Sequence, residues 1–174
     1  MKSRLNTRIE AQARQVLSDT GCLRVPVPVD LVAHRLGLRV EAGLLGEDVS
    51  GLLVVGEGKG IIGFNVTHAP VRQRFSIAHE IGHFVLHQKK ASLFIDKTYM
   101  TYRRDQRSSS GEDLSEIQAN QFAAALLMPE DLLSREIPAI GFDLADEAAL
   151  EFLAQKFEVS RQSMSFRLAN LGII

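Results

Sequence analysis

Residues 74–87 read RFSIAHEIGHFVLH and contain the pattern H-E-x-x-H inside an otherwise apolar stretch. On an α-helix, residues four apart lie nearly above one another, so His79 and His83 can both reach one metal ion. Two neutral imidazoles suit zinc, and the adjacent carboxylate of Glu80 can take a proton from a metal-bound water. The pattern therefore predicts a helix that carries a zinc-hydrolase site.

The residues around this pattern favour a helix that is buried on its other side. With His79 at zero in a helical projection, the apolar residues fall between about 140° and 260°: Ile77, Ala78, Ile81, Phe84 and Val85. An accidental match on a solvated helix would lack such a face. Gly82 costs about 1 kcal/mol relative to alanine in a helix interior, which indicates that another backbone or side chain approaches closely there.

Length and composition predict one globular domain. The chain has 174 residues, of which 45% are hydrophobic and 24% charged, enough for one sizeable core. We expect residues 1–174 to form a single domain with N-terminal helices in 1–37, the sheet and zinc-site helices in 38–128, and a helical part in 129–174. The net charge of −1 gives no overall sign of nucleic-acid binding or of a polybasic membrane anchor.

The first residues lead into no apolar run of a signal peptide, and no later run approaches the roughly 18 apolar residues of a membrane span. The single cysteine, Cys22, cannot form an internal disulfide, in agreement with a reducing compartment. We therefore expect a cytoplasmic protein in which Cys22 is a small side chain near a helix end.

Helical spacing and end signals predict helices on both sides of the motif. The expected helices cover 4–20, 31–36 with Asp30 as its cap, 114–127, a short stretch after Pro129, 145–157, and 161–171 with Ser160 as its cap. Gly21, Gly37 and Gly172 are predicted stops.

Residues 38–66 predict a small antiparallel sheet. Residues 38–41 alternate, and the apolar runs 50–55 and 60–66 are separated by a glycine-containing turn typical of a hairpin. Gly60 and Gly63 weaken a strand but permit close backbone approach. Strand 60–66 is therefore either an exposed edge that pairs with an extended peptide or an ordinary strand in a covered sheet.

Residues 88–112 lack periodicity, and a connection of this length is usually a functional flap or a mobile segment. We expect it to border the site. Tyr99 and Tyr102, the only tyrosines of the chain, are candidates there for donating a hydrogen bond to an oxyanion.

A catalytic zinc needs three protein ligands and an open position. The metzincin extension is excluded because positions 86 and 89 hold Leu86 and Lys89. His87 continues the spacing, but two helical turns, roughly 12 Å, separate it from His79, so both cannot bind one ion. We expect a structural role for His87.

Glu116 is the better candidate for the third ligand. Its helix carries small residues on the same face, Ala119 and Ala123, which allow it to press against the motif helix. Asn120, one turn on, can then hydrogen-bond a ligand histidine and fix its ring. A helix-dipole role for Glu116 is the alternative, and the carboxylates immediately before it, at positions 112 and 113, compete for the ligand role.

The motif helix and residues 116–129, EIQANQFAAALLMP, together resemble the ImmA/IrrE family of metallopeptidases. The resemblance implies an α+β, zincin-like metallopeptidase core with zinc on His79, His83 and Glu116. Manganese is the alternative working metal. It implies Glu80 as the general base. It also implies an endopeptidase that cleaves a helix-turn-helix transcriptional repressor encoded nearby, in stress response or in mobile elements.

A regulator from another class is the rival hypothesis. Residues 153–172 look like the two helices of a helix-turn-helix, with a recognition helix that would offer Arg161, Gln162 and Arg167 to a DNA groove. Only two of these are basic, so we prefer helices that pack as a cap or hold a repressor. A protein that binds a repressor without cutting it is a third possibility, and the oligomeric state is not indicated.

Overall fold

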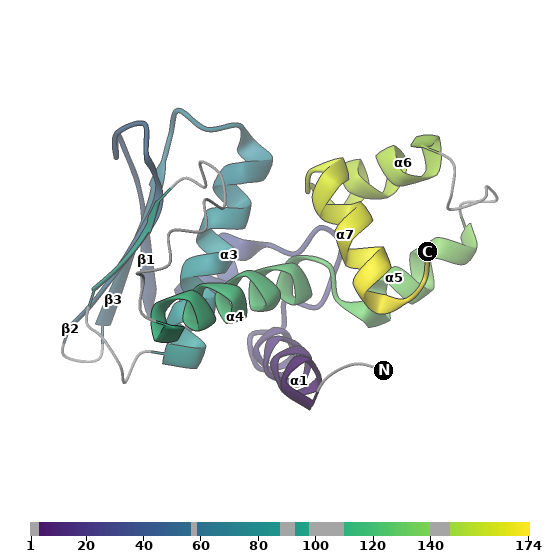
Figure 1. Cartoon of the computed structure of the whole chain (residues 1–174), viewed down its shortest axis with the longest axis horizontal. Coiled ribbons are helices and arrows are strands. Elements are labelled where there is room, and N and C mark those ends of the chain that lie inside the picture. The colour runs from purple at the N-terminus through teal and green to yellow at the C-terminus, as the bar shows by residue number, and fades with distance from the viewer. Residues whose placement is uncertain (1–3, 57–58, 88–92, 98–109, 140–146) are drawn as a thin grey trace.

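The computed structural model describes the chain except for residues 1–3, 57–58, 88–92, 98–109 and 140–146. The architecture is α+β, as predicted. Figure 1 shows the sheet at one end of the long axis, helices α3 and α4 crossing beside it, and helices α5 to α7 at the other end. Within the described residues, no helix is long and apolar enough to cross a membrane.

The N-terminal helices are α1 (Arg4–Asp19) and α2 (Val29–Arg35). α1 ends as predicted, since Gly21 has a φ of +58° and Cys22 N donates to Leu17 O at 2.9 Å. Cys22 lies just past the end of α1, as expected, and is fully buried. The cap of α2 was predicted wrongly, because the helix already starts at Val29. Pro28 occupies the cap position without a side-chain hydrogen bond, and Asp30 lies in the first turn.

The sheet has four strands in the order β1-β3-β2-β4: β1 (Leu38–Gly43), β2 (Val49–Gly56), β3 (Lys59–Asn65) and β4 (Leu93–Lys97). β2 and β3 form the predicted antiparallel hairpin. β1 runs parallel to β3, so the sheet is mixed and the prediction of a purely antiparallel sheet is wrong. The reason is the order of the strands. After β1 the chain first forms β2 and then turns back through the hairpin to form β3, which lies between β1 and β2 and runs in the same direction as β1.

β3 is an inner strand, which corrects the alternative that residues 60–66 form an exposed edge. It pairs with β1 on one side and β2 on the other, so both of its backbone edges are used within the sheet. Ile62 at its centre is fully buried. A proline there would disrupt the sheet itself rather than a site for peptide binding.

β4 lies within the segment 88–112 that was predicted to lack regular structure. Residues 93–97 pair antiparallel with β2 and form one edge of the described sheet. Only five residues long, this strand is too short for its alternation to stand out from the polar residues around it. Tyr99 and Tyr102 lie outside the described residues, so their predicted role stays a prediction.

The motif helix is α3 (Pro70–His87), and α4 (Ser110–Leu127) crosses it. The face opposite the histidines is buried at Ile77 (3% exposed), Ala78 and Ile81 (both 0%), as predicted, whereas Phe84 and Val85 nearer the end of the helix are partly buried. The close approach expected at Gly82 is confirmed. A Cβ there would lie 3.1 Å from Ala119 O and 3.3 Å from the Cβ of Phe122 on α4. A bare backbone at Gly82 thus lets the two helices meet.

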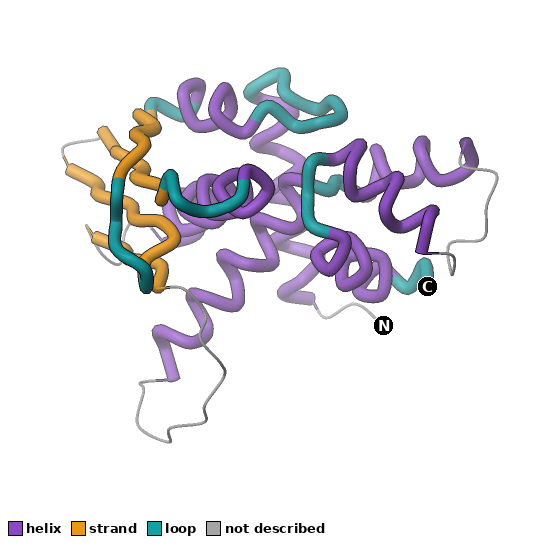
Figure 2. Tube along the Cα trace, turned by 90° about the horizontal axis from the view of Figure 1, so that it is seen from above, coloured by secondary structure: helices purple, strands orange, loops and turns teal. Residues whose placement is uncertain are grey.

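The chain continues through α5 (Glu130–Glu136), a short 3-10 helix (Ile137–Ala139), α6 (Glu147–Phe157) and α7 (Arg161–Leu171), and Figure 2 shows these helices set away from the strands. The predicted ends of α7 are confirmed. Ser160 Oγ accepts a hydrogen bond from Ser163 N at 3.1 Å, and Gly172 has a φ of 71°.

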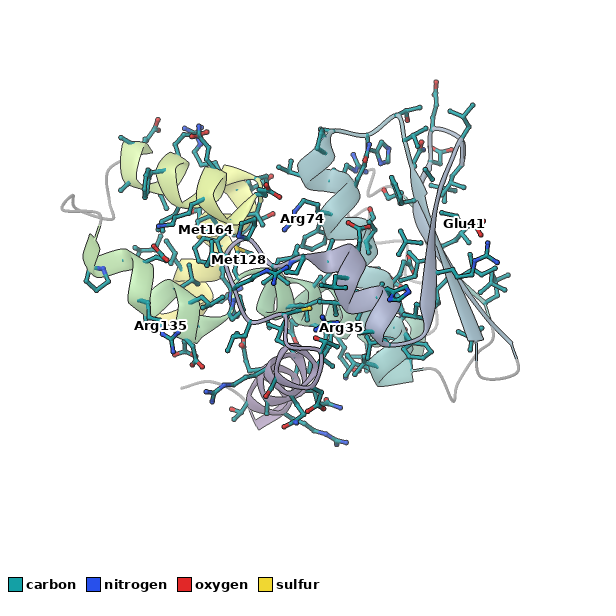
Figure 3. All side chains as sticks on the ribbon, turned by 180° about the vertical axis from the view of Figure 1, so that it is seen from behind. Arg35, Glu41, Arg74, Met128, Arg135 and Met164 are labelled. Atoms are coloured by element: carbon teal, nitrogen blue, oxygen red, sulfur yellow. The ribbon has the colours of Figure 1, made fainter. Side chains whose placement is uncertain are left out.

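Two arginines tie these helices to the rest of the molecule. Arg167 of α7 is buried, donates to Met128 O at 2.9 Å, and forms a bidentate ion pair with Glu10 of α1. Arg74 of α3, labelled in Figure 3, donates to Val27 O and pairs with Glu158 between α6 and α7. Burial lowers the pKa of Arg74, and the charges of Glu158 and Asp30 oppose that shift.

Candidate metal centre

Three side chains from the two crossing helices meet at one point. His79 and His83 are one turn apart on α3, almost completely buried, and their Nε2 atoms lie 3.0 Å apart. Glu116 reaches them from α4, with Oε2 at 3.1 Å from His79 Nε2 and Oε1 at 3.1 Å from His83 Nε2. The structure thus brings together the three residues proposed from the sequence as metal ligands.

The donor set fits a small cation. Among the described residues, His79, His83 and Glu116 form a group whose ligand atoms all lie within 4.8 Å of one another. Ligand atoms at about 2.1 Å from a tetrahedral zinc are separated by about 3.4 Å, only slightly more than the distances here. Two imidazole nitrogens and one carboxylate oxygen are also donor types that zinc accepts.

The other candidates for the third ligand are placed differently. The ring of His87 is buried one turn beyond His83, with the ring centroids 5.8 Å apart, and it is not part of the three-residue group. The side chains at positions 112 and 113 lie outside what the structure describes. Glu116 is therefore the carboxylate that the described structure places against both histidines.

Asn120 orients one of the histidines. Its Oδ1 lies 3.0 Å from His79 Nδ1, one turn along α4 from Glu116. Because an amide oxygen accepts, the proton belongs on Nδ1, which leaves Nε2 unprotonated and facing Glu116 and His83. This is the arrangement expected from the sequence for Asn120, and it is the tautomer that a metal ligand requires.

The charge state of Glu116 also suits a ligand. Burial, the largest single influence, raises the pKa of Glu116. When the imidazoles carry a proton on Nε2, hydrogen bonds from His79 and His83 and their charges outweigh burial and lower the pKa from 4.5 to about 2. A bound metal ion would replace those Nε2 protons. Glu116 is therefore an anion at neutral pH, the form that binds a cation.

Glu80 follows His79 on α3 and also contacts the sheet. It is fully buried, and its carboxylate lies against the backbone of β2, where a Cβ added to Gly51 would be 2.9 Å from Glu80 Oε1. The imidazoles instead turn toward α4, because successive helical residues are separated by about 100° around the axis. α3 thus presents two imidazoles to one neighbour and a carboxylate to the other.

Sequence reasoning missed Gly51. A glycine inside a predicted strand signals a bulge or a close backbone approach, so a general signal was present. The signal does not predict that Glu80 is the residue in contact with Gly51, because the two lie on a strand and a helix that are separated in the sequence.

The sequence is similar to that of a known peptidase family. The sequence model of the M78 peptidases, described as the IrrE N-terminal-like domain, matches residues 33–169. The chain belongs to this family. Membership of the M78 family implies a metal ion, and the group formed by His79, His83 and Glu116 is where the described residues could hold it.

Individual relatives agree with this family. The chain is 33% identical over 108 residues to the radiation response metalloprotease IrrE of Deinococcus radiodurans, covering 62% of this chain and 30% of that protein. A solved transcriptional regulator from Mycobacterium tuberculosis has a TM-score of 0.63 at 18% identity, over 94% of this chain and 46% of that one. The second match shows a shared fold alone, and this chain spans less than half the length of either relative.

Proposed function

We propose that this protein is a zinc-dependent endopeptidase that hydrolyses a peptide bond in a protein substrate. The observation that carries the proposal is that His79, His83 and Glu116 meet where α3 and α4 cross. The buried Glu80 is the next residue after His79 on α3. Membership of the M78 family and the relation to a metalloprotease support it.

In this proposal His79, His83 and Glu116 hold the zinc. When bound, zinc supplies Lewis-acid chemistry, since it polarises the scissile carbonyl and lowers the pKa of the attacking water. Asn120 keeps the ring of His79 in the tautomer that frees Nε2. Glu80 accepts the proton of the attacking water at its carboxylate and later passes that proton to the leaving amine.

The test is a change from Glu80 to Gln. Glutamine keeps the size of the side chain but cannot accept the proton, so cleavage should fall by about 100-fold or more while one zinc per chain remains. Cleavage of an intact helix-turn-helix repressor is measured by gel electrophoresis, and metal by elemental analysis. If the zinc-loaded wild type cuts no faster than Glu80→Gln, the protein is not a peptidase of this kind and binding without turnover becomes the better account.

We propose as substrate a cytoplasmic helix-turn-helix repressor encoded nearby. The resemblance of the motif helix and residues 116–129 to the ImmA/IrrE family supports this choice, and the relative named for a radiation response is in keeping with a stress-related repressor. Manganese is the alternative working metal. Metal-free protein reloaded with zinc or manganese in separate samples, each assayed on the same repressor, decides between them.

The DNA-binding alternative is weakened by the position of Arg167. This arginine, one of the two basic residues proposed for a recognition helix, is buried and bonded to Glu10 and Met128. Arg161 and Gln162 remain exposed on α7, and Arg161 pairs with Glu147 of α6. We therefore propose that α6 and α7 hold the protein substrate. A salt-dependent shift of random duplex DNA by micromolar protein would argue for DNA binding instead.

A further inference from the structure

We infer that Gly51 is a positioning residue for Glu80. Its lack of a side chain leaves the space in which the Glu80 carboxylate lies, and any larger residue would move that carboxylate away from where it accepts a proton. This inference rests on the proposed function, because it gives Glu80 the role of general base. It concerns only the place of the carboxylate and leaves the three proposed metal ligands unchanged.

Gly51 has no room for a side chain on the side that faces Glu80. A Cβ at this position would lie 2.9 Å from Glu80 Oε1, 3.4 Å from Glu80 Cγ and 3.4 Å from Gly63 O. The contact with Oε1 is well inside the roughly 3.5 Å at which nonbonded heavy atoms pack best. Glu80 is fully buried, so its carboxylate cannot turn into solvent to escape. It must take another direction within the interior.

The backbone of Gly51 is itself fixed by α3. The pairing of β2 with β4 shifts between Val49 and Gly51, which makes Ser50 the extra residue of a β-bulge. Ser50 is buried, and its Oγ accepts a hydrogen bond from Arg72 Nη2 at 3.0 Å. Arg72 precedes Glu80 by just over two turns of the same helix. One helix therefore both anchors the bulge and carries the carboxylate that faces it.

The other sheet glycines make different contacts. A Cβ at Gly56, on the same strand, would meet nothing within 4 Å. At Gly60 and Gly63 it would meet leucine side chains first, those of Leu38 and Leu52. Among the described glycines of the strands, Gly51 is thus the one whose added Cβ would meet an ionisable side chain. Gly56 is the matched control, since an added methyl group there has open space.

The experiment compares Gly51→Ala with Gly56→Ala in the full chain loaded with zinc. We expect Gly51→Ala to keep one zinc per chain and a melting temperature near that of the wild type, while kcat on the intact repressor falls at least about tenfold with little change in KM. Gly56→Ala should match the wild type in all four measurements. Wild-type kcat in a folded, zinc-loaded Gly51→Ala variant overturns the inference.

Two further measurements separate this inference from the proposed function. In a Glu80→Gln background, Gly51→Ala should lower the remaining activity no further, because both changes act on one group. An additional tenfold loss there would show that Gly51 acts elsewhere. In metal-free protein, the ¹³C resonance of the Glu80 carboxyl, assigned with Glu80→Gln, should move in Gly51→Ala but not in Gly56→Ala. This readout tests the placement even if the wild type cuts no substrate, and an unmoved resonance contradicts it.

Should Gly51→Ala fail to fold, a shorter acid provides the test. Glu80→Asp withdraws the carboxylate by one methylene, so Gly51→Ala combined with Glu80→Asp should fold and give the circular dichroism spectrum of the wild type. Failure of the double variant as well would mean that the space at Gly51 serves something other than Glu80, and the inference would be wrong.

Discussion

Asn120 acts on the centre from the far side of the His79 ring, through the 3.0 Å contact with Nδ1. Removal of such a partner typically costs 10- to 100-fold in metal affinity, since the ring loses both its tautomer and its orientation. We expect about that loss for Asn120→Ala, measured by competition with a zinc chelator. Asn120→Asp keeps an acceptor oxygen and should restore the affinity. Equal zinc affinity in the wild type and Asn120→Ala would show that Asn120 does not contribute to metal binding.

His83 and His87 offer a matched pair on successive turns of α3. Both are buried, but His83 Nε2 lies 3.1 Å from Glu116 Oε1, whereas His87 lies outside the three-residue group. His83→Ala should abolish stoichiometric zinc, and His87→Ala should retain it. Elemental analysis of the two folded variants checks this. Full zinc in His83→Ala would contradict the proposed ligand set.

At the scale of single residues, the sequence predicted more of the site than of its surroundings. Helical geometry alone places His79 and His83 on one face, and small residues beside Glu116 predicted which helix would meet them. The role of Gly51 was not predicted, because it depends on a contact between segments that are distant in the sequence. The cap of α2 escaped because several nearby residues can begin a helix, and packing of Val29, which is fully buried, decides among them.

The crossing of α3 and α4 determines whether Glu116 reaches the histidines at all. Gly82 permits this crossing, with Ala119 O only 3.1 Å from where its Cβ would be. Gly82→Leu should push the helices apart, reduce the free energy of unfolding by about 1–3 kcal/mol and weaken zinc binding.

Urea denaturation and a chelator titration measure the two effects of Gly82→Leu. Gly82→Ala is the control with a smaller side chain. Its methyl group overlaps less with Ala119 and Phe122 than leucine does, and a gain of about 1 kcal/mol in helix propensity opposes that overlap. We expect it to stay much closer to the wild type. A folded Gly82→Leu variant with unchanged zinc affinity would show that Glu116 does not depend on this crossing.

At the scale of elements, helices were predicted better than strand partners. Periodicity and end signals are local, so α1 and α7 end at Gly21 and Gly172 as expected. Strand order and direction depend on contacts that alternation does not encode. The sequence therefore did not predict that β1 pairs parallel with β3 or that β3 is an inner strand, and both became evident only in the complete sheet.

Arg167 links the last helix to the first. Arg167 is buried and Glu10 is partly buried, so Arg167→Leu removes a partly desolvated ion pair and the hydrogen bond to Met128 O, and should reduce the free energy of unfolding by about 2 kcal/mol. Arg161→Leu is the control on the same helix, because the Arg161–Glu147 pair is exposed and should contribute less than about 1 kcal/mol. Chemical denaturation of both variants checks the contrast, and equal losses would contradict it.

The proposed division between a cutting site and a helical docking part predicts a strong preference for folded substrate. If α6 and α7 hold the repressor, a short peptide that spans its cleavage site loses that binding energy and should be cleaved with a much lower kcat/KM than the intact repressor. Parallel assays with equal enzyme measure the ratio. Equal kcat/KM values would mean that the C-terminal helices do not contribute to substrate selection.

The Glu10–Arg167 pair also affects the order in which the newly made chain becomes stable. Its two members are 157 positions apart, so Glu10 leaves the ribosome long before Arg167, whose charge compensates that of Glu10, has been added to the chain. A chain broken off before α7 contains α3 and α4 yet lacks this ion pair and the packing around it. We expect cellular quality control to degrade such fragments, so that the proposed peptidase activity accumulates only with chains that include α7.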